Sequence, residues 1–365
     1  MRSWMSHTTD PTVLRSAMDG GAGGECGIMF SMTPKFEIPR PEDAKHLRKY
    51  FTMRPCRACE SGWIDFFIWA DYYRVRYHAV EDEALLVIMK NEREYFAALP
   101  YCAEEKLPEY FELLKRFFND VLEQAFKIYL ADEEGVMALR LKDNPEYIVR
   151  EEADFRDYIY DAEELRTLPG RKFQKKRNLI NKFCKEYEGR WSYRTLQCAD
   201  RAEILSFLNE WFPNHAEADA DGATTLRFER DGLTGVLQDC CHLTYRIGGI
   251  MIDGRLRAFS LGTYNAREEM ACISVEKADP EIPGLYQLIN REFLLHEFPE
   301  AKIVNREDDM GLPGVRQAKL SYNPVAFENK YMVVQKEFRG EAVEVFDPFE
   351  DEVAQFGQTG RSTCC

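Results

Sequence analysis

The sequence lacks long apolar runs, and it is short of positive charge. No stretch approaches the ~18 consecutive apolar residues that a membrane-spanning helix needs, so we predict no integral membrane segment. Lysines and arginines number 48 against 63 aspartates and glutamates, which gives a formal net charge of −15. Because attraction to nucleic-acid phosphates needs a basic field, this balance excludes a general nucleic-acid binder and leaves room only for a local basic patch.

Several catalytic and metal-binding signatures are also missing. The chain has no GxSxG, no HExxH and no P-loop GK[ST] motif, and its six histidines are scattered, which argues against a Ser-His or Cys-His nucleophile. Cys56 and Cys59 form a lone CxxC without the second pair that a zinc site needs. The acidic run from Glu217 resembles a calcium loop but has Phe228 where the last carboxylate belongs. We therefore predict no metal site, and we expect Cys240, Cys241 and His242 to serve core packing.

The composition is that of a folded protein. Hydrophobic residues make up 45% of the chain and aromatic residues 13%, which excludes wholesale disorder. The 365 residues are enough for two domains of ordinary size. Eleven cysteines without an apolar signal sequence predict reduced thiols and a cytoplasmic location.

The spacing of apolar residues predicts alternating helices and strands. In the first half we expect helices over 41–51 and 107–129, and strands over 63–77, 84–90 and 136–141. In the second half we expect helices over 162–168, 171–187, 201–212, 223–240, 284–298 and 315–320, and strands over 191–196, 243–252, 256–264, 270–275, 301–304 and 330–335. Asp253-Gly254 between two of these strands is a favoured two-residue hairpin turn.

The order in the second half is that of the GNAT acyltransferase fold, in which a splayed central strand pair holds the donor. The first half is a plausible degenerate copy. We therefore predict an α/β (α+β) chain with two tandem GNAT-like acyltransferase domains, each with a mixed central sheet. The predicted boundaries are 33–153 and 154–338, between a flexible tail over 1–32 and an acidic tail over 339–365.

Two polar segments of the second half are candidate site segments. The segment 305–322 (NREDDMGLPGVRQAKLSY) follows an apolar strand and combines opposite charges with two glycines and a proline, a poor composition for a core. Glu276 ends a predicted strand, where a carboxylate can orient or deprotonate an attacking amine. The alternatives are a salt-bridged structural turn and an ion pair at a strand end.

The helix predicted over 171–187 is strongly basic. Its densest part is Lys175-Lys176-Arg177-Asn178, which predicts a phosphate platform for a tRNA acceptor end or another anionic donor. A solvated face that offsets an acidic protein is the alternative.

These segments carry a family resemblance. The motifs concerned are Tyr160-x-x-Glu163-Glu164-Leu165-x-x-Leu168-x-Gly170-Arg171, Lys175-Lys176-Arg177-Asn178, Glu276-Lys277-Ala278, Gly284-x-Tyr286, Asn290-x-x-Phe293, Asn305-Arg306-Glu307-Asp308-Asp309-x-Gly311 and Arg316-x-x-Lys319-x-Ser321-Tyr322-x-Pro324. With the aromatic region 63–73, they resemble the uncharacterised bacterial proteins grouped with the C-terminal domain of phosphatidylglycerol lysyltransferase, over about 34–338. The resemblance implies tandem GNAT-like domains similar to the Fem-type peptidyl transferases, which move an aminoacyl group from tRNA to an amine or hydroxyl acceptor.

The resemblance implies a soluble acyl- or aminoacyltransferase with an aminoacyl-tRNA or acyl-CoA donor and a small-molecule or peptide acceptor. The pyrophosphate loop Q/R-x-x-G-x-G/A is absent after 270–275, which disfavours CoA. A noncatalytic ligand-binding sensor and a CoA-dependent N-acetyltransferase are the alternatives. The expected catalytic residues are Glu276, Arg306 and Tyr322. Glu276 would act as base or orient the acceptor amine, Arg306 would bind a phosphate or carboxylate or stabilise the oxyanion, and Tyr322 would protonate the leaving oxygen. The expected donor- and substrate-binding residues are Lys175, Lys176, Arg177, Asn178, Lys277, Tyr286, Asn290, Asn305, Glu307, Asp308, Asp309, Arg316 and Lys319.

Overall fold

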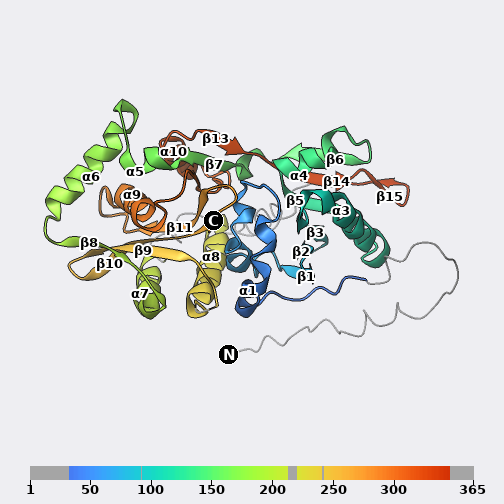
Figure 1. Ribbon diagram of the computed structural model, residues 1–365, viewed down its shortest axis with the longest axis horizontal. Helices are drawn as coiled ribbons and strands as arrows, with labels where there is room; N and C mark the ends of the chain where they lie inside the picture. The colour runs from blue at the N-terminus through green and yellow to red at the C-terminus, as the bar shows by residue number, and fades with distance from the viewer. Residues whose placement is uncertain (1–32, 92, 213–219, 241, 346–365) are drawn as a thin grey trace, which may run out of the picture. The chain divides into compact units, whose positions relative to one another are not determined.

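The computed structural model describes residues 33–91, 93–212, 220–240 and 242–345. The elements of the first half are η1 (Pro41–Asp43), α1 (Ala44–Leu47), η2 (Tyr50–Thr52), η3 (Cys59–Ser61), α2 (Asp65–Ile68), β1 (Arg76–Val80), β2 (Ala84–Lys90), β3 (Tyr95–Ala97), β4 (Tyr101–Cys102), η4 (Glu104–Lys106), α3 (Leu107–Arg116), η5 (Phe117–Val121), β5 (Lys127–Asp132), α4 (Glu133–Ala138), η6 (Leu141–Asp143), β6 (Tyr147–Glu151) and η7 (Ala153–Phe155) (Figure 1).

The elements of the second half follow in the same order. They are β7 (Asp157–Asp161), α5 (Ala162–Thr167), η8 (Arg171–Phe173), α6 (Gln174–Glu186), β8 (Trp191–Thr195), η9 (Cys198–Asp200), α7 (Arg201–Trp211), α8 (Ala220–Gln238), β9 (Arg246–Ile252), β10 (Arg255–Asn265), β11 (Met270–Ala278), α9 (Leu285–Glu297), β12 (Ile303–Asn305), α10 (Pro313–Leu320), β13 (Ala326–Glu328), β14 (Lys330–Gln335), β15 (Glu337–Phe338) and β16 (Glu341–Ala342).

The first sheet takes one strand from the far end of the chain. Its order is β1-β2-β3-β5-β14-β6, with β4 paired to β2. β14 is antiparallel to both β5 and β6 and lies between them. The chain therefore returns from the second half to complete the first sheet, and residues from 35 on form one compact unit. The domain boundary near residue 153 stays a prediction.

The second sheet opens at its centre. Its order is β13-β7-β12-β11-β10-β9-β8. β11 and β12 are parallel, and their pairing covers only Met270–Cys272 against Ile303–Asn305. The remainder of β11 continues past the end of β12, so the two strands splay apart. A register shift between Leu261 and Gly262 of β10 accompanies this part of β11.

Helices cover both faces of the second sheet. One buried cluster joins α5, α6 and α9 to inward residues of the sheet such as Ile250 and Ile273. The other cluster joins α7 and α8 to the opposite face, through residues such as Phe259 and Val275, and continues into the first half. Within the described residues, the fold is thus mixed α/β, as predicted, with two seven-stranded mixed sheets and a separate two-stranded sheet of β15 and β16.

Most predicted elements of the second half are confirmed within a few residues. The hairpin turn is confirmed as well, since Asp253 and Gly254 both have positive φ, at 51° and 77°. In the first half, β2 coincides with the strand predicted over 84–90.

Three predictions in the first half were wrong. Residues 63–77 do not form one strand, because Ile64, Phe67 and Ile68 lie at helical spacing and are buried around α2. The helix predicted over 107–129 ends near residue 121, and its last part is β5, held by pairing with β14.

The strand predicted over 136–141 begins instead with a helix, α4. Asp132 caps this helix by accepting a hydrogen bond from the Gly135 amide at 2.9 Å. The local cap therefore outweighs the short apolar pattern.

The expectation of reduced thiols was wrong at one pair. Cys198 and Cys240 form a disulfide, because η9 and the end of α8 bring their Cα atoms to 5.7 Å. Within the described residues, no helix has the length and apolarity to cross a membrane. The predicted tail over 1–32, the start of the acidic run at Glu217, Cys241 and the end of the acidic tail over 346–365 lie outside the described residues.

Candidate active site

An ion pair bridges the point where β11 and β12 splay apart. Glu276 lies near the end of β11, and Arg306 directly follows β12. Arg306 Nη2 donates to Glu276 Oε1 at 3.0 Å. The two side chains are 12% and 13% exposed, so the pair is sheltered without being sealed from solvent. The fold thus places Glu276 opposite the start of the 305–322 segment.

α9 supplies a third polar group. Asn290 Nδ2 donates to Glu276 Oε2 at 3.0 Å, so both carboxylate oxygens are held in place. Arg306 Nη1 and Asn290 Oδ1 are buried without a hydrogen-bond partner within the protein. Buried polar atoms normally have partners, and so these two atoms mark a place prepared for a polar ligand or for water.

Two tyrosines and a lysine line the other side of Arg306. Its guanidinium carbon lies 4.7 Å from the ring centre of Tyr322 and 5.7 Å from that of Tyr160. Lys176 of α6 places Nζ 3.3 Å from the Tyr322 ring centre and donates to Ser321 Oγ at 2.8 Å. Two cations, Lys176 and Arg306, thus lie close to the Tyr322 ring, and the quadrupole of the ring attracts both of them.

Burial sets the proton affinity of these groups. It raises the pKa of the Tyr322 phenol, which therefore keeps its proton at neutral pH. Burial, with a further contribution from the Arg306 charge, lowers the pKa of Lys176 to about 8. Lys176 therefore changes charge close to physiological pH.

Lys319 fixes the backbone beside Arg306. Its ammonium donates to the carbonyl oxygens of Arg306, at 2.5 Å, and of Asp308. The Tyr160 hydroxyl donates to the Lys319 carbonyl at 2.9 Å. Lys319 consequently holds the turn between β12 and α10. Its ammonium donates to backbone carbonyls, and so its role here is structural.

The three acidic residues of the 305–322 segment diverge. Asp309 is buried, accepts from Arg316 Nη2 at 2.7 Å and Nε at 2.8 Å, and accepts from the Tyr158 hydroxyl. Asp308 points instead to a second buried cluster, where its carboxylate lies 3.7 Å from Lys330 Nζ. Burial and the neighbouring Asp65 charge raise the pKa of Glu307.

Lys330 is the centre of that second cluster. Its side chain is 0% exposed, and its ammonium lies 2.8 Å from Asp157 and 2.9 Å from Glu60. It also lies 3.1 Å from Cys59 Sγ. Asn305 Nδ2 donates to Asp157 at 2.9 Å, which places this predicted ligand-binding residue in the structural cluster.

The structure brings together Lys176, Glu276, Asn290, Arg306 and Tyr322, with Lys319 beside them, and separates the other predicted residues from them. Lys175 and Asn178 are exposed on α6. Arg177 donates to the carbonyls of Leu168 and Gly170.

Two further candidates, Lys277 of β11 and Tyr286 of α9, contact Trp211. Lys277 binds Glu229 of α8 at 2.7 Å and lies over the Trp211 ring. Tyr286 interacts with Trp211 and with the Ala278 backbone. Both are therefore expected to act in packing.

A hollow adjoins the cluster. It has a volume of about 600 Å³ and is lined by Pro313, Arg316, Gln317, Leu320 and Ser321 of α10 and its end. Ser321 is shared between this hollow and Lys176. Lys176 therefore contacts both the Tyr322 ring and Ser321, which lines the hollow.

Sequence reasoning missed Tyr160, Asp157 and Lys330 as parts of these clusters. The sequence did contain a signal for two of them, since Asp157 and Lys330 are charged residues at the first positions of the buried strands β7 and β14. Their partners are remote in sequence, and so only the fold identifies them.

The sequence profile described as "Phosphatidylglycerol lysyltransferase, C-terminal" matches residues 57–334. An uncharacterized protein of Mycoplasmoides gallisepticum is 27% identical over 208 residues, which cover 56% of this chain and 64% of that protein. The match thus spans less than two thirds of this curated relative.

Solved structures give the same picture. A conserved protein of unknown function from Bacteroides thetaiotaomicron has 27% identity and a TM-score of 0.76, over 83% of this chain and 100% of that one. The structure of L-PGS from Bacillus licheniformis has 16% identity and a TM-score of 0.60, over 88% and 98%. At that identity the likeness concerns the fold alone. The profile match covers most of the chain, and the chain therefore belongs to the phosphatidylglycerol lysyltransferase C-terminal family.

Proposed function

We propose that this protein is an aminoacyltransferase that moves an aminoacyl group from the ester of an aminoacyl-tRNA to an amine or hydroxyl acceptor. The observation that carries the proposal is the Glu276–Arg306 pair across the splayed strands, at 3.0 Å. In a GNAT-like sheet this is where the donor carbonyl enters. Family membership adds that aminoacyl transfer is the activity after which the family is named.

Each side chain has a defined role in this reaction. Glu276 accepts the proton of the attacking amine or hydroxyl, since each carboxylate oxygen keeps a lone pair beyond its bond to Arg306 or Asn290. Arg306 Nη1, which has no protein partner, stabilises the oxyanion of the tetrahedral intermediate. Tyr322 donates its proton to the ribose oxygen as the ester bond breaks. The proton balance closes when Tyr322 is reprotonated from Glu276 or from water.

Lys176 supplies positive charge beneath Tyr322. Its cation favours the tyrosinate that forms when Tyr322 gives up its proton. It also favours an anionic donor at the nearby hollow, because Ser321 joins the two. The acceptor is proposed as a small molecule or a peptide.

A CoA donor is disfavoured by the start of α9. Gly284 precedes this helix with φ at 90°, and a Cβ there would lie 2.5 Å from the Leu179 carbonyl oxygen of α6. The backbone of α6 thus packs closely against the residue before the helix start, which is where a pyrophosphate would meet free amides. This close packing supports an aminoacyl-tRNA over acetyl-CoA.

The test is a transfer assay on the full-length protein. Total tRNA charged with labelled amino acids is mixed with a panel of small amines and dipeptides, and label is followed into stable amide products. The wild type should transfer label, and Glu276→Gln should slow transfer by about 10²- to 10⁴-fold. Consumption of acetyl-CoA instead would support the N-acetyltransferase alternative. Thermal stabilisation by a ligand without any turnover would support the sensor alternative.

A further inference from the structure

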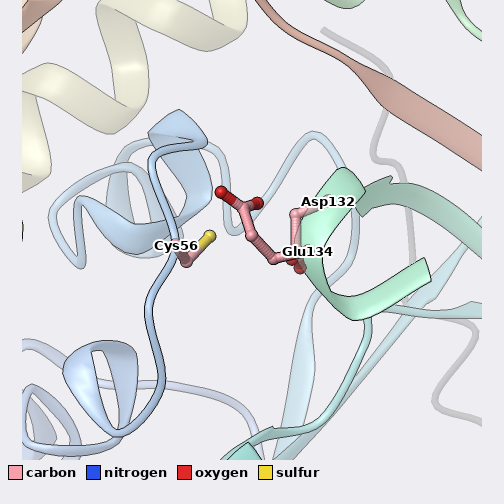
Figure 2. A group of neighbouring side chains, drawn as sticks. All are labelled: Cys56, Asp132 and Glu134. Carbon is pink, nitrogen blue, oxygen red and sulfur yellow. The ribbon is translucent and has the colours of Figure 1, made fainter. Parts of the chain in front are cut away.

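The two cysteines of the CxxC have different surroundings. Cys59 groups with Asp157 and Asp308, and the ammonium of Lys330 already lies among them. Cys56 lies in the coil before η3 and groups with Asp132 and Glu134 of the β5–α4 junction. Figure 2 shows the Cys56 sulfur facing the carboxylate of Glu134, with Asp132 beside it. The two cysteines of the motif therefore do not face one common metal site, and Cys56 belongs to a cluster of its own.

The Cys56 cluster is compact and only partly compensated. The ligand-type atoms of Cys56, Asp132 and Glu134 all lie within 4.8 Å of one another. Asp132 accepts from both terminal nitrogens of Arg54, one of them at 2.6 Å, so its charge is paired. Glu134 Oε2 is buried and has no hydrogen-bond partner within the protein.

Glu328, the last residue of β13, lies beside Glu134 of this cluster. It is 7% exposed, and its Oε1 atom also has no hydrogen-bond partner. Its carboxyl group shares a hydrogen bond with that of Glu134 and is also close enough to Asp132 to feel its charge. A buried group of carboxyls without a compensating cation is costly, and the Cys59 cluster avoids this cost through Lys330. Within the described residues, no lysine or arginine makes an ion pair with Glu134 or Glu328.

We propose that Cys56, Glu134 and Glu328, with Asp132 at the edge, bind a divalent cation of the zinc class. A thiolate with carboxylates suits Zn²⁺, whereas Mg²⁺ and Ca²⁺ take oxygen ligands. Bonds of about 2.0–2.3 Å in a tetrahedron place ligand atoms roughly 3.5 Å apart, so atoms that now lie within 4.8 Å of one another would approach by at most about 1.3 Å on binding. Sequence analysis did not find this site because Cys56, the Asp132–Glu134 segment and Glu328 lie far apart in the sequence.

Such an ion would tie three parts of the fold together. Cys56 belongs to the coil before η3, Glu134 to α4 beside the first sheet, and Glu328 to β13 of the second sheet. The cation therefore acts as a clamp between the sheets, separate from the Glu276–Arg306 site. This inference does not depend on the proposed transfer reaction.

The experiment uses full-length protein stripped with EDTA and then given Zn²⁺ or Co²⁺. The wild type should bind one equivalent more than Cys56→Ser and Glu328→Gln, measured by elemental analysis after gel filtration. Co²⁺ bound to the wild type should show a thiolate charge-transfer band that Cys56→Ser lacks. Zn²⁺ should raise the melting temperature of the wild type and leave that of Glu328→Gln unchanged.

The matched control is Cys59→Ser, which changes the other cysteine of the same motif. It should keep the extra equivalent of metal and the Co²⁺ band. Equal metal content in wild type, Cys56→Ser and Glu328→Gln would overturn the proposal, as would loss of the band in Cys59→Ser alone. Glu328→Gln is nearly isosteric, and circular dichroism spectra verify that each variant is folded.

Discussion

Arg306 reaches across the gap between β11 and β12 to hold Glu276, with Nη2 and Oε1 3.0 Å apart. Glu276 lies near the end of β11 and Arg306 directly follows the neighbouring strand β12, so the pair exists only when the splayed sheet is formed. The contact therefore reports both the fold and the candidate chemistry. It also leaves Arg306 Nη1 free for a ligand.

Replacing Glu276 should separate chemistry from folding. Glu276→Gln keeps the shape and the contact with Asn290 but removes the base, so we expect transfer to fall by about 10²- to 10⁴-fold with little change in KM. Steady-state kinetics with the charged-tRNA assay measure this. Glu269→Gln is the control, because Glu269 forms an exposed pair with Lys302. An equal loss in both variants would argue against a catalytic Glu276.

Lys176 should impose an alkaline limit. The pKa of Lys176 is lowered to about 8, so its charge is present below that pH and lost above it. We expect kcat/KM to fall as pH rises through about 8, and Lys176→Arg to extend activity to higher pH. Lys176→Met should be slow at every pH. Lys182→Met, on an exposed position of α6, should follow the wild-type profile.

Removing Lys330 should destabilise the fold strongly. Lys330→Met leaves the buried Asp157 and the partly buried Glu60 without their cation, and we expect a loss of about 3–5 kcal/mol in the free energy of unfolding. Urea titration measures the loss. Adding Asp157→Asn to this variant should restore part of the stability. A double variant as unstable as the sum of the two single variants would mean that the pair is not coupled.

Stability should fall as pH rises from about 4 to about 8. Burial raises the pKa of Asp65 to about 8 and that of Glu60 to about 7, so the folded protein keeps protons that the unfolded chain has released. Each such proton lowers the free energy of unfolding by up to about 1.4 kcal/mol per pH unit within this range. Urea titrations at several pH values test the slope, which Asp65→Asn should flatten. A free energy of unfolding that rises with pH over this range would contradict the raised pKa values of Asp65 and Glu60.

The sequence predicted local elements well where one pattern dominated. β2 is a continuous apolar run and was located correctly, whereas α4 was taken for a strand because its cap at Asp132 is a single residue. β5 was taken for the end of a helix, since the partner that makes it a strand, β14, lies far away in sequence. Propensity alone does not contain that information.

The same division applies to the site. Lys176, Glu276, Asn290, Arg306 and Tyr322 were named from motifs, and the fold brings them together. Arg316 and Asn305 come from the same motif but bind Asp309 and Asp157, because neighbours in sequence turn to different sides of the loop. Which charge is paired internally and which stays available depends on tertiary contacts.

The position of β14 has a consequence for how the protein is made. The ribosome synthesises β5 and β6 long before β14, yet β14 must lie between them. Until residue 335 has emerged, the nascent first sheet has two unpaired inner edges, which are places for mispairing or chaperone capture. The first half therefore cannot mature ahead of the second, and a truncation before Lys330 would expose the centre of a sheet instead of trimming its margin.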